Sequence, residues 1–433
     1  MKMSLFQVIL LAVFGLGGVI GLFVFSTQTN SGAKNAVGSV VIWGTLPKDG
    51  VTAVIALASQ TDATYKGVSY VQKDPATLAV DLAAAIATGS GPDLLLASQE
   101  ELRGLAKFVV PLSLQTLPAS TFTTTFIQGA NIFGTANGYY GVPFLVDPLV
   151  LFYNRSILSS SGIAKPPATW EALTGLVPAV ATLTPTRQVT RGLIALGTYN
   201  NVHNARGILS TLFLQTRVPI ATYSAGSGML SADLGTKAQT GVPAGQAVLG
   251  FYTQFADPSK ISYTWNTSLP DSRQSFLAGD LALYLGYASE ARYLLAANPN
   301  LSFNVAPVPQ PETAQVRSVY GLVYALMTPR GAKNVAGALQ VATYFSGQAA
   351  QSVAAGAAGL APTNLNNLAV VPADPTAAVA YAEALYTKAW LSPAPAGTDA
   401  IFSSMIVDVI SGRSTPDVAL AAAERSLTAL LQQ

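Results

Sequence analysis

The sequence predicts an α/β protein built from two lobes, and three features point to this fold class. The chain has 433 residues, which is more than one compact domain usually holds. Strand-like and helix-like segments alternate after residue 39, as they do when helices cover a parallel sheet. A lone acid, Asp147, interrupts a long apolar stretch, and a crossing from one lobe to the other is expected there.

The composition excludes several classes of function. Hydrophobic residues make up 50% of the chain and charged residues 10%, so there is ample material for two cores. The net charge of +2, without a basic run, gives no reason to expect nucleic acid. With no cysteine and one histidine, His203, we expect no disulfide, no metal site, no cofactor and no catalytic triad. A phosphate-binding loop of the form GxxxxGK[ST] is missing from the sequence, so the chain is not itself an ATPase.

The N-terminal residues predict a membrane anchor. Residues 4–25 form an apolar run with two polar residues, and Lys2 precedes it. The run is long enough to span a bilayer as a helix, and its end lacks the small-residue pattern of a cleavage site. We therefore expect a transmembrane helix within residues 1–25 that is not cleaved, with the body of the protein outside the cell. A cleaved secretory signal is the alternative, and residues 26–38 predict a flexible linker.

The next segment predicts the first α/β lobe. Strands are expected at 39–43, 68–72 and 93–97, and helices at 51–59 and 77–88. This order implies parallel strands covered by helices. Ligands of such sheets bind beyond the carboxyl ends of the strands, which fall here at 43–48 and 97–100.

The expected crossing lies between residues 139 and 153. Residues 139–146 and 149–153 each have the apolar, β-branched and aromatic character of a strand, and Asp147-Pro148 separates them. Two strands in series around a lone acid fit a passage between lobes. A single kinked strand with Asp147 in a turn fits the same residues, and both interpretations stay open.

The remaining elements follow from periodicity and helix caps. Helices are expected at 170–181, 208–215, 245–255, 272–276, 290–297 and 332–345, strands at 192–197, 281–287, 301–308 and 318–327, and a loop or short hairpin at 221–244. Thr169, either Asp271 or Ser272, and Ser289 stand where they can cap helices, and Pro416 follows Thr415 at a first helical position. The polar loop that begins at Tyr199 and contains Asn200 and His203 is a candidate part of a cleft.

Several motifs resemble those of one protein family when they are taken together. They are VIWGTLPKDG and GSGPDLLLAS in the first lobe, YGVPFLVDPLVLFYN at the first crossing, SFLAGDLALYL with FNVAPVPQ at the second, LAPTN at the third, and the ending SGRSTPDVALAAAERSL. Their order and spacing are similar to those of the family 1 extracellular solute-binding proteins, the binding components of ABC importers, to which maltose-binding protein belongs. The resemblance covers about residues 39–433.

The resemblance implies a two-lobed fold of the periplasmic-binding-protein type II kind with hinge crossings. It implies a first lobe of residues 39–146 and 304–360 and a second of 147–303 and 361–433. Members of the family close on a solute and deliver it to a membrane permease, and a separate ATPase drives transport. We therefore expect a monomeric, non-enzymatic, extracellular sugar-binding protein whose partners are ABC permease subunits.

The resemblance also implies ligand-binding positions. Lys48 and Glu100 fall where the relatives have a lysine and an acid that contact sugar hydroxyls. Ala97 and Ser289 stand where the relatives have stacking tryptophans, so maltodextrin is not implied as the solute. The full set of expected contacts is Trp43, Lys48, Glu100, Asp147, Tyr199, Trp265, Tyr287, Ser289, Tyr320, Gly321 and Asp399. Two solvated charges at Lys48 and Glu100, and a core position for Trp265, are the structural alternatives.

Two other functions fit parts of the sequence. A protein of the same fold can bind a polyamine or a metal cation, but the tyrosine pair Tyr139-Tyr140 precedes the crossing and the cleft acids are few. A surface-anchored glycoside hydrolase needs two carboxylates about 5–9 Å apart across a sugar bond. Asp147 with Glu290 or Glu100 is such a pair by residue type only. Capture of a carbohydrate remains the leading hypothesis.

Overall fold

The computed structural model describes residues 37–223, 229–238 and 241–433. The predicted anchor, residues 1–25, and most of the predicted linker lie outside these described residues. Within the described part of the chain, no helix is long and apolar enough to cross a membrane.

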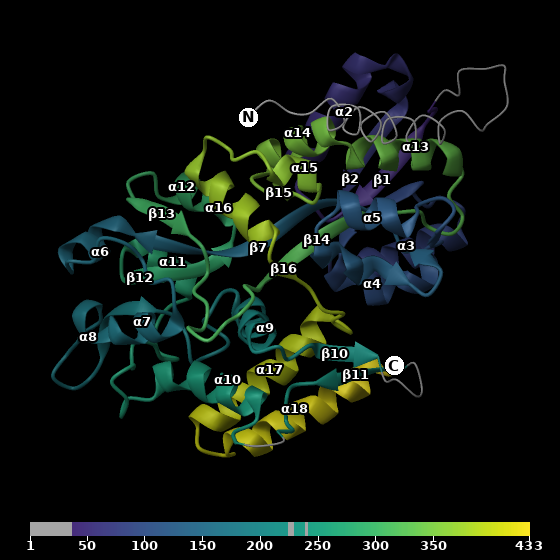
Figure 1. Ribbon diagram of the computed structural model, residues 1–433. Helices are drawn as coiled ribbons and strands as arrows, with labels where there is room; N and C mark the ends of the chain where they lie inside the picture. The colour runs from purple at the N-terminus through teal and green to yellow at the C-terminus, as the bar shows by residue number, and fades with distance from the viewer. Residues whose placement is uncertain (1–36, 224–228, 239–240) are drawn as a thin grey trace, which may run out of the picture. The chain divides into compact units, whose positions relative to one another are not determined.

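One mixed sheet of 11 strands forms the frame of the described chain (Figure 1). Its order is β2 (Val68–Gln72), β1 (Val40–Gly44), β3 (Leu94–Ser98), β14 (Val319–Met327), β7 (Val142–Asn154), β12 (Leu281–Tyr287), β9 (Val189–Ile194) and β8 (Thr182–Leu183). β13 (Phe303–Ala306) and β15 (Ala361–Pro362) pair with β7, and β16 (Thr387–Lys388) pairs with β14. Strands β1, β2 and β3 are parallel to one another, β14 is antiparallel to β3 and β7 and parallel to β16, and β7 is antiparallel to β12.

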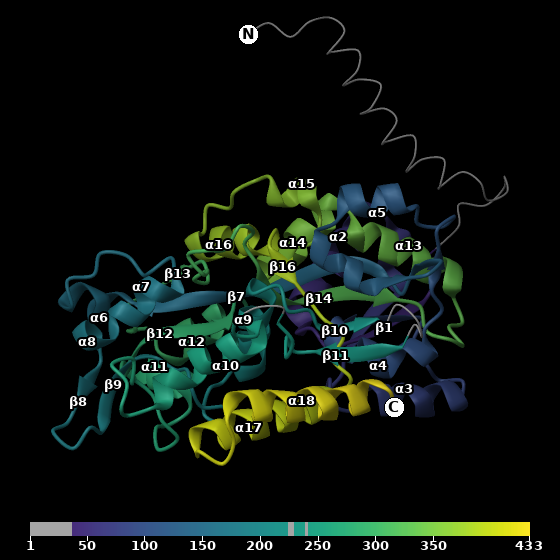
Figure 2. The ribbon, with the colours of Figure 1, turned by 60° about the horizontal axis from the view of Figure 1, so that its bottom comes forward.

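Helices cover both faces of the first half of the sheet. They are α2 (Lys48–Thr61), α3 (Leu78–Ala87), α4 (Gln99–Leu105), α13 (Val335–Ser346) and α14 (Gln348–Ala358). Figure 2 shows α2 and α13 on one face, and α3 and α4 on the other. All five residues of β3 are buried, as expected for a strand with helices on both sides. Residues 112–139 add the short strands β4 (Leu112–Ser113), β5 (Gly134–Thr135) and β6 (Gly138–Tyr139), and helix α5 (Ala119–Thr125).

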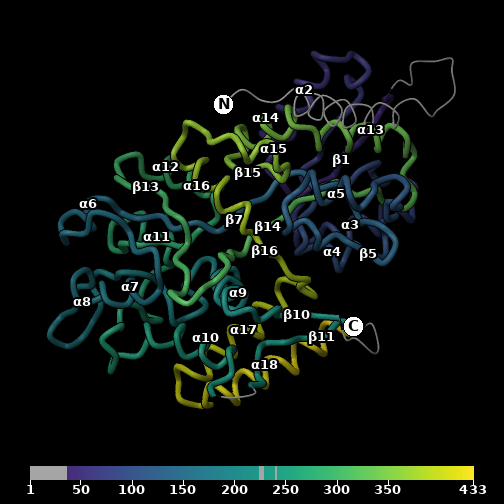
Figure 3. The backbone as a smooth tube through the Cα atoms, in the orientation of Figure 1, coloured from purple at the N-terminus to yellow at the C-terminus, as the bar shows by residue number. Residues whose placement is uncertain are grey.

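The second half of the sheet carries its own set of helices, which Figure 3 labels from α6 to α12. They are α6 (Arg155–Ser160), α7 (Trp170–Gly175), α8 (Val177–Val180), α9 (Ala205–Gln215), α10 (Ala244–Thr253), α11 (Ser272–Ala278) and α12 (Glu290–Ala297). A hairpin of β10 (Ile220–Tyr223) and β11 (Leu230–Asp233) lies within the segment expected to be a loop or hairpin. The helix expected at 170–181 is two helices, because Pro178 lies in the first turn of the second one.

β7 runs through Asp147 as one strand, which is the second of the two interpretations left open, except that Asp147 lies within a paired strand and not in a turn. β7 runs for 13 residues, pairs with β14 up to Pro148 and continues beside β12 from Leu149. Pro148 lacks an amide hydrogen, but its carbonyl accepts a 3.0 Å hydrogen bond from the amide of Ala288. The extended backbone that Pro148 imposes on Asp147 suits a strand with neighbours on both sides. β7 and β14 therefore pass together from one half of the sheet to the other.

The C-terminal segment packs against both halves of the sheet. α15 (Leu365–Leu368) packs against α14 and α5, and α16 (Pro375–Ala384) packs against β7 and β13. α17 (Pro395–Ile410) and α18 (Pro416–Leu431) pack against each other and against α10 in the second half. The lobe boundaries expected from the sequence stay predictions. The path of the C-terminal segment places α17 against α9, and α18 against α17 and α10.

Candidate functional site

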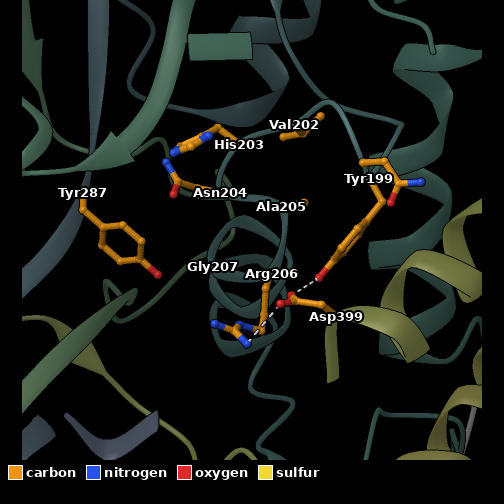
Figure 4. Close-up of a pocket in the computed structure, with 10 residues that line it drawn as sticks. Tyr199, Val202, His203, Asn204, Ala205, Arg206, Gly207, Tyr287 and Asp399 are labelled. Atoms are coloured by element: carbon orange, nitrogen blue, oxygen red, sulfur yellow. Dashed lines mark hydrogen bonds and ion pairs between the residues drawn. The ribbon is translucent and has the colours of Figure 1, made fainter. Parts of the chain in front are cut away.

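A polar pocket of about 300 Å³ lies at the N-terminus of α9 (Figure 4). It is lined by Tyr199, Asn200, Val202, His203, Asn204, Ala205, Arg206, Gly207, Tyr287 and Asp399. The loop after β9 and the start of α9 supply most of these residues, β12 supplies Tyr287, and α17 supplies Asp399. This volume is at the lower end of the roughly 300–1,000 Å³ typical of small-molecule sites.

Arg206 lies between two carboxylates at this pocket. Its Nη2 is 3.6 Å from Oε2 of Glu100, and its Nη1 is 3.4 Å from Oδ2 of Asp399. Tyr199 donates a 2.6 Å hydrogen bond from its hydroxyl to Oδ1 of Asp399, as Figure 4 shows. Burial lowers the pKa of Arg206, but Glu100 and its other anionic neighbours raise it more, so the guanidinium stays charged. Glu100 belongs to α4 and Arg206 to α9, so this ion pair joins the two halves of the sheet.

Glu100 is held from behind by the crossing strand β14. Its side chain is 4% exposed, and Tyr320 donates a hydrogen bond from its hydroxyl to Oε1 of Glu100. Gln99 donates to the Tyr320 hydroxyl at 3.1 Å and accepts from the amide of Val323 at 2.7 Å, which fixes the tyrosine. Burial raises the pKa of Glu100, and Arg206 and Tyr320 oppose this rise. Among the described residues, Oε2 of Glu100 has no hydrogen-bond donor.

Glu290 supports the opposite wall of the pocket. Its Oε1 accepts hydrogen bonds from the side-chain amide of Asn204 at 2.7 Å and from the backbone amide of Tyr287 at 2.9 Å. Its Oε2 accepts a 2.5 Å hydrogen bond from Tyr284 and lies 3.7 Å from Nη1 of Arg273. The Glu290 side chain is only 11% exposed. Glu290 therefore positions Asn204 and Tyr287, which line the pocket.

Asp147 faces the backbone of the second half of the sheet. It is 4% exposed, and its Oδ1 accepts a 3.1 Å hydrogen bond from the amide of Ser289. This bond ties the crossing strand β7 to the residue before α12. Burial raises the pKa of Asp147 from its ordinary value of 3.8 to about 7, although the Ser289 hydrogen bonds oppose the rise.

Replacing Asp147 with asparagine is expected to remove a pH dependence of stability. Between about pH 4 and pH 7 the folded protein keeps a proton on Asp147 that the unfolded chain has lost. The free energy of unfolding therefore falls as the pH rises through this window, and on the order of 1–4 kcal/mol is lost above it. Asparagine does not ionise, and its oxygen still accepts from Ser289. Urea titrations at pH 4 and pH 8 measure the free energy of unfolding of both proteins. Relative to the parent, the variant should be more stable at pH 8 than at pH 4, and an equal difference at both pH values would refute this.

The structure brings five of the residues expected from the sequence to this site. Tyr199, Tyr287 and Asp399 line the pocket, and Glu100 and Tyr320 form the network behind Arg206. The polar loop at 199–204 also contributes Asn200 and His203, as expected.

Two of the other expected residues, Gly321 and Ser289, lie where β7 and β14 pass between the halves of the sheet. Gly321 pairs with Pro148, and a Cβ added to Gly321 would lie 3.0 Å from the carbonyl oxygen of Asp147, so glycine lets β14 and β7 approach closely. Ser289 contributes its backbone amide to Asp147. These residues hold the passage between the halves together and do not line the pocket.

The last three expected residues are placed away from the pocket. Trp265 is 1% exposed and lies in the hydrophobic core near Gly192, which corrects the expectation of a cleft aromatic. Lys48 is an exposed residue that begins α2. Trp43 is half-buried, and the ammonium of Lys73 lies 3.9 Å from the centroid of its ring. Trp265 packs beside Gly192, where an added Cβ would lie 3.4 Å from Cε3 of its ring, and the local sequence does not reveal this contact between distant segments.

Arg206 is the central residue of the site, and it was not among the residues expected from the sequence. The helix was expected to begin at Ile208, which left Arg206 unassigned, whereas α9 begins at Ala205. One signal was present. A cation in the first turn of a helix opposes the helix dipole, so such an arginine needs a compensating partner. Glu100 and Asp399 are those partners, and they are far from Arg206 in the sequence.

No group of three or more histidine, cysteine, aspartate or glutamate side chains is placed to hold a metal ion in the described residues. His203 is the single histidine of the chain, and its Nδ1 is 3.4 Å from Oδ2 of Asp271, which caps α11.

Comparison with known families decides the classification. A family model described as bacterial extracellular solute-binding protein matches residues 53–383. The chain belongs to this family. A search of curated protein sequences found no match. The family resemblance seen in the sequence motifs is therefore confirmed, and an extracellular body is what this family implies.

Solved structures of solute-binding proteins have the same two-lobed α/β fold. One is a cyclo/maltodextrin-binding protein complexed with maltotetraose, with a TM-score of 0.73 and 14% identity over 93% of this chain and 99% of that chain. Another is the cyclic α-maltosyl-1,6-maltose binding protein from Arthrobacter globiformis, with a TM-score of 0.73 and 16% identity over 91% and 99%. A third is the GacH receptor of Streptomyces glaucescens, with a TM-score of 0.66 and 18% identity over 92% and 99%. At these identities the likeness establishes the fold.

Proposed function

We propose that this solute-binding protein captures a carbohydrate at the Arg206 pocket and delivers it to the permease of an ABC importer. The observation that carries the proposal is the combination of side chains around the pocket. Tyr199 and Tyr287 offer aromatic faces of the kind that pack on sugar rings. Arg206, Asn204 and Asp399 offer charged and amide groups that pair with hydroxyls. The similar structures include complexes with maltotetraose, mannotriose and α-D-tagatose, which supports this choice of solute class.

Closure of two lobes on the solute is part of the proposal. β7 and β14 are the strands that pass between the halves of the sheet, and they would act as the hinge. The Arg206–Glu100 ion pair lies where the halves meet, next to the pocket. Binding at this place would add contacts to both halves and so favour the closed arrangement. The modest pocket volume supports a short sugar over a long oligosaccharide.

A thermal-shift screen of the purified protein tests the proposal. A sugar that binds the folded state alone should add about 2.7 kcal/mol to its stability at a hundredfold excess over Kd, which raises the unfolding temperature. The screen should contain mono- and disaccharides, amino acids, spermidine and ferric citrate. We expect shifts with sugars and a smaller shift in Tyr287→Ala. Shifts with spermidine or ferric citrate alone would contradict the proposal and support a cation-binding protein.

We also propose that the protein performs no chemistry on its solute. A glycoside hydrolase needs two carboxylates that reach the scissile bond from either side. Asp147 is buried against the Ser289 amide, and Glu290 is occupied by the donors described above, which supports a binding role. Turnover of chromogenic glycosides by the purified protein would contradict this.

Attachment to the membrane by residues 1–25 is a further proposal. It is supported by the length and apolar character of the run at 4–25, which suit a bilayer-spanning helix. The protein should then be recovered from the membrane fraction with its N-terminal residues intact. Recovery in the soluble fraction, or an N-terminus beyond residue 25, would contradict attachment.

A further inference from the structure

The charges at the pocket do not balance. Arg206 is the single lysine or arginine among the described lining residues, and it lies between two carboxylates, those of Glu100 and Asp399. The hydroxyls of Tyr320 and Tyr199 each donate a hydrogen bond to one of these carboxylates. One guanidinium therefore faces two carboxylates.

The two carboxylates differ in their access to water. The Glu100 side chain is 4% exposed, whereas the Asp399 side chain is 45% exposed. A carboxylate withdrawn from water requires a counter-charge within the protein, since leaving it alone costs several kcal/mol. Arg206 serves both carboxylates: its Nη1 donates a 3.4 Å hydrogen bond to Asp399, while Oε2 of Glu100 has no donor among the described residues. One guanidinium is thus shared by two carboxylates, and Asp399 is the one that water, or a bound solute, can reach.

Two other basic side chains near the pocket lie beside carboxylates of their own. Arg273 lies 3.7 Å from Glu290, and Nδ1 of His203 lies 3.4 Å from Asp271. Neither pair includes Asp399. Figure 4 shows Asp399 at the edge of the pocket, and dashed lines mark its interactions with Tyr199 and Arg206. Two carboxylates thus share one guanidinium, and Asp399 is the one of the two that lines the pocket.

We propose that the pocket selects a sugar that carries a protonated amine, with Asp399 as the group that recognises it. This inference rests on the proposed sugar-binding function and narrows its substrate class. An ammonium group brings a positive charge and three hydrogen-bond donors, and hydrogen bonds between ionised partners are about twice as strong as neutral ones. A hydroxyl in the same position would bring one donor and no charge.

Calorimetric titration of the full chain with matched sugar pairs tests this inference. The pairs are glucosamine with glucose, galactosamine with galactose, and mannosamine with mannose, at a pH at which the amines are protonated. N-acetylglucosamine and glucuronate serve as uncharged and anionic probes. In at least one pair we expect the amine to bind about tenfold more tightly or better, which corresponds to about 1.4 kcal/mol.

Variants on one helix provide the matched control. Asp399→Asn should reduce the preference for the amine to about twofold or less, because the side chain keeps its shape and loses its charge. Asp408→Asn removes a carboxylate from the same helix, where it pairs with Arg413 away from the pocket, and should leave the preference unchanged.

Each result has a definite meaning. Equal or tighter binding of the neutral sugar in all three pairs would overturn the amino-sugar inference and leave sugar binding standing. Tighter binding of glucuronate would also overturn it and would assign the free charge to Arg206. A preference for the amine that survives Asp399→Asn would refute the role of Asp399. Failure of every sugar to bind would overturn the proposed function together with the inference.

Discussion

Replacing Arg206 with methionine is expected to lower the free energy of unfolding by about 3–5 kcal/mol at pH 8. Removing one partner of a buried ion pair leaves the other charge without compensation, and such losses are typically of this size. Here the stranded charge is Glu100, whose side chain is 4% exposed. Asp399 contributes less to the loss, because water reaches it. Urea denaturation of the two proteins measures the difference.

The pH dependence of this loss provides a second reading. Burial already raises the pKa of Glu100, and removing Arg206 raises it further, so the folded variant keeps a proton that the unfolded chain releases. The destabilisation should therefore be smaller at pH 5 than at pH 8. Adding Glu100→Gln to the variant should recover much of the lost stability at pH 8. Additive effects of the two substitutions would show that the residues do not interact.

Replacing Glu290 with alanine is expected to cost about 2–4 kcal/mol of stability and to weaken solute binding at least tenfold. The substitution removes the acceptor for Asn204, Tyr284 and the amide of Tyr287, and leaves Arg273 without its partner. Hydrogen bonds to a charged group are worth about 1.5–3 kcal/mol each, and their partners relax only in part. Binding suffers because Tyr287 and Asn204 lose the group that positions them.

Two controls separate this effect from a general loss of charge. Glu290→Gln keeps an acceptor and should retain part of the stability, with a smaller loss of binding. Glu312→Ala removes an exposed carboxylate and should change stability by no more than about 0.5 kcal/mol. A Glu290→Ala protein with unchanged affinity would show that the pocket wall holds without this carboxylate.

Local patterns predicted many elements of the fold with accurate limits. The strand at 68–72, the strand at 281–287 and the helix at 290–297 have the predicted bounds, and Asp271 caps α11 through its side chain. Each of these depends on residues close together in the sequence. The ordered motifs at 39–433 also identified the family, which the match to residues 53–383 confirms.

The sequence by itself determined the alternation of strands and helices, the family and the loop at Tyr199, because these depend on local periodicity, caps and motif order. The tertiary structure decided what distant residues do for one another. β7 is continuous through Asp147 because β14 and β12 pair with it on both sides of that residue. Trp265 is 1% exposed in the hydrophobic core, next to Gly192 of a distant strand. Arg206 is central because folding brings Glu100 and Asp399 within 4 Å of one guanidinium, and no local pattern encodes such an encounter between separate segments.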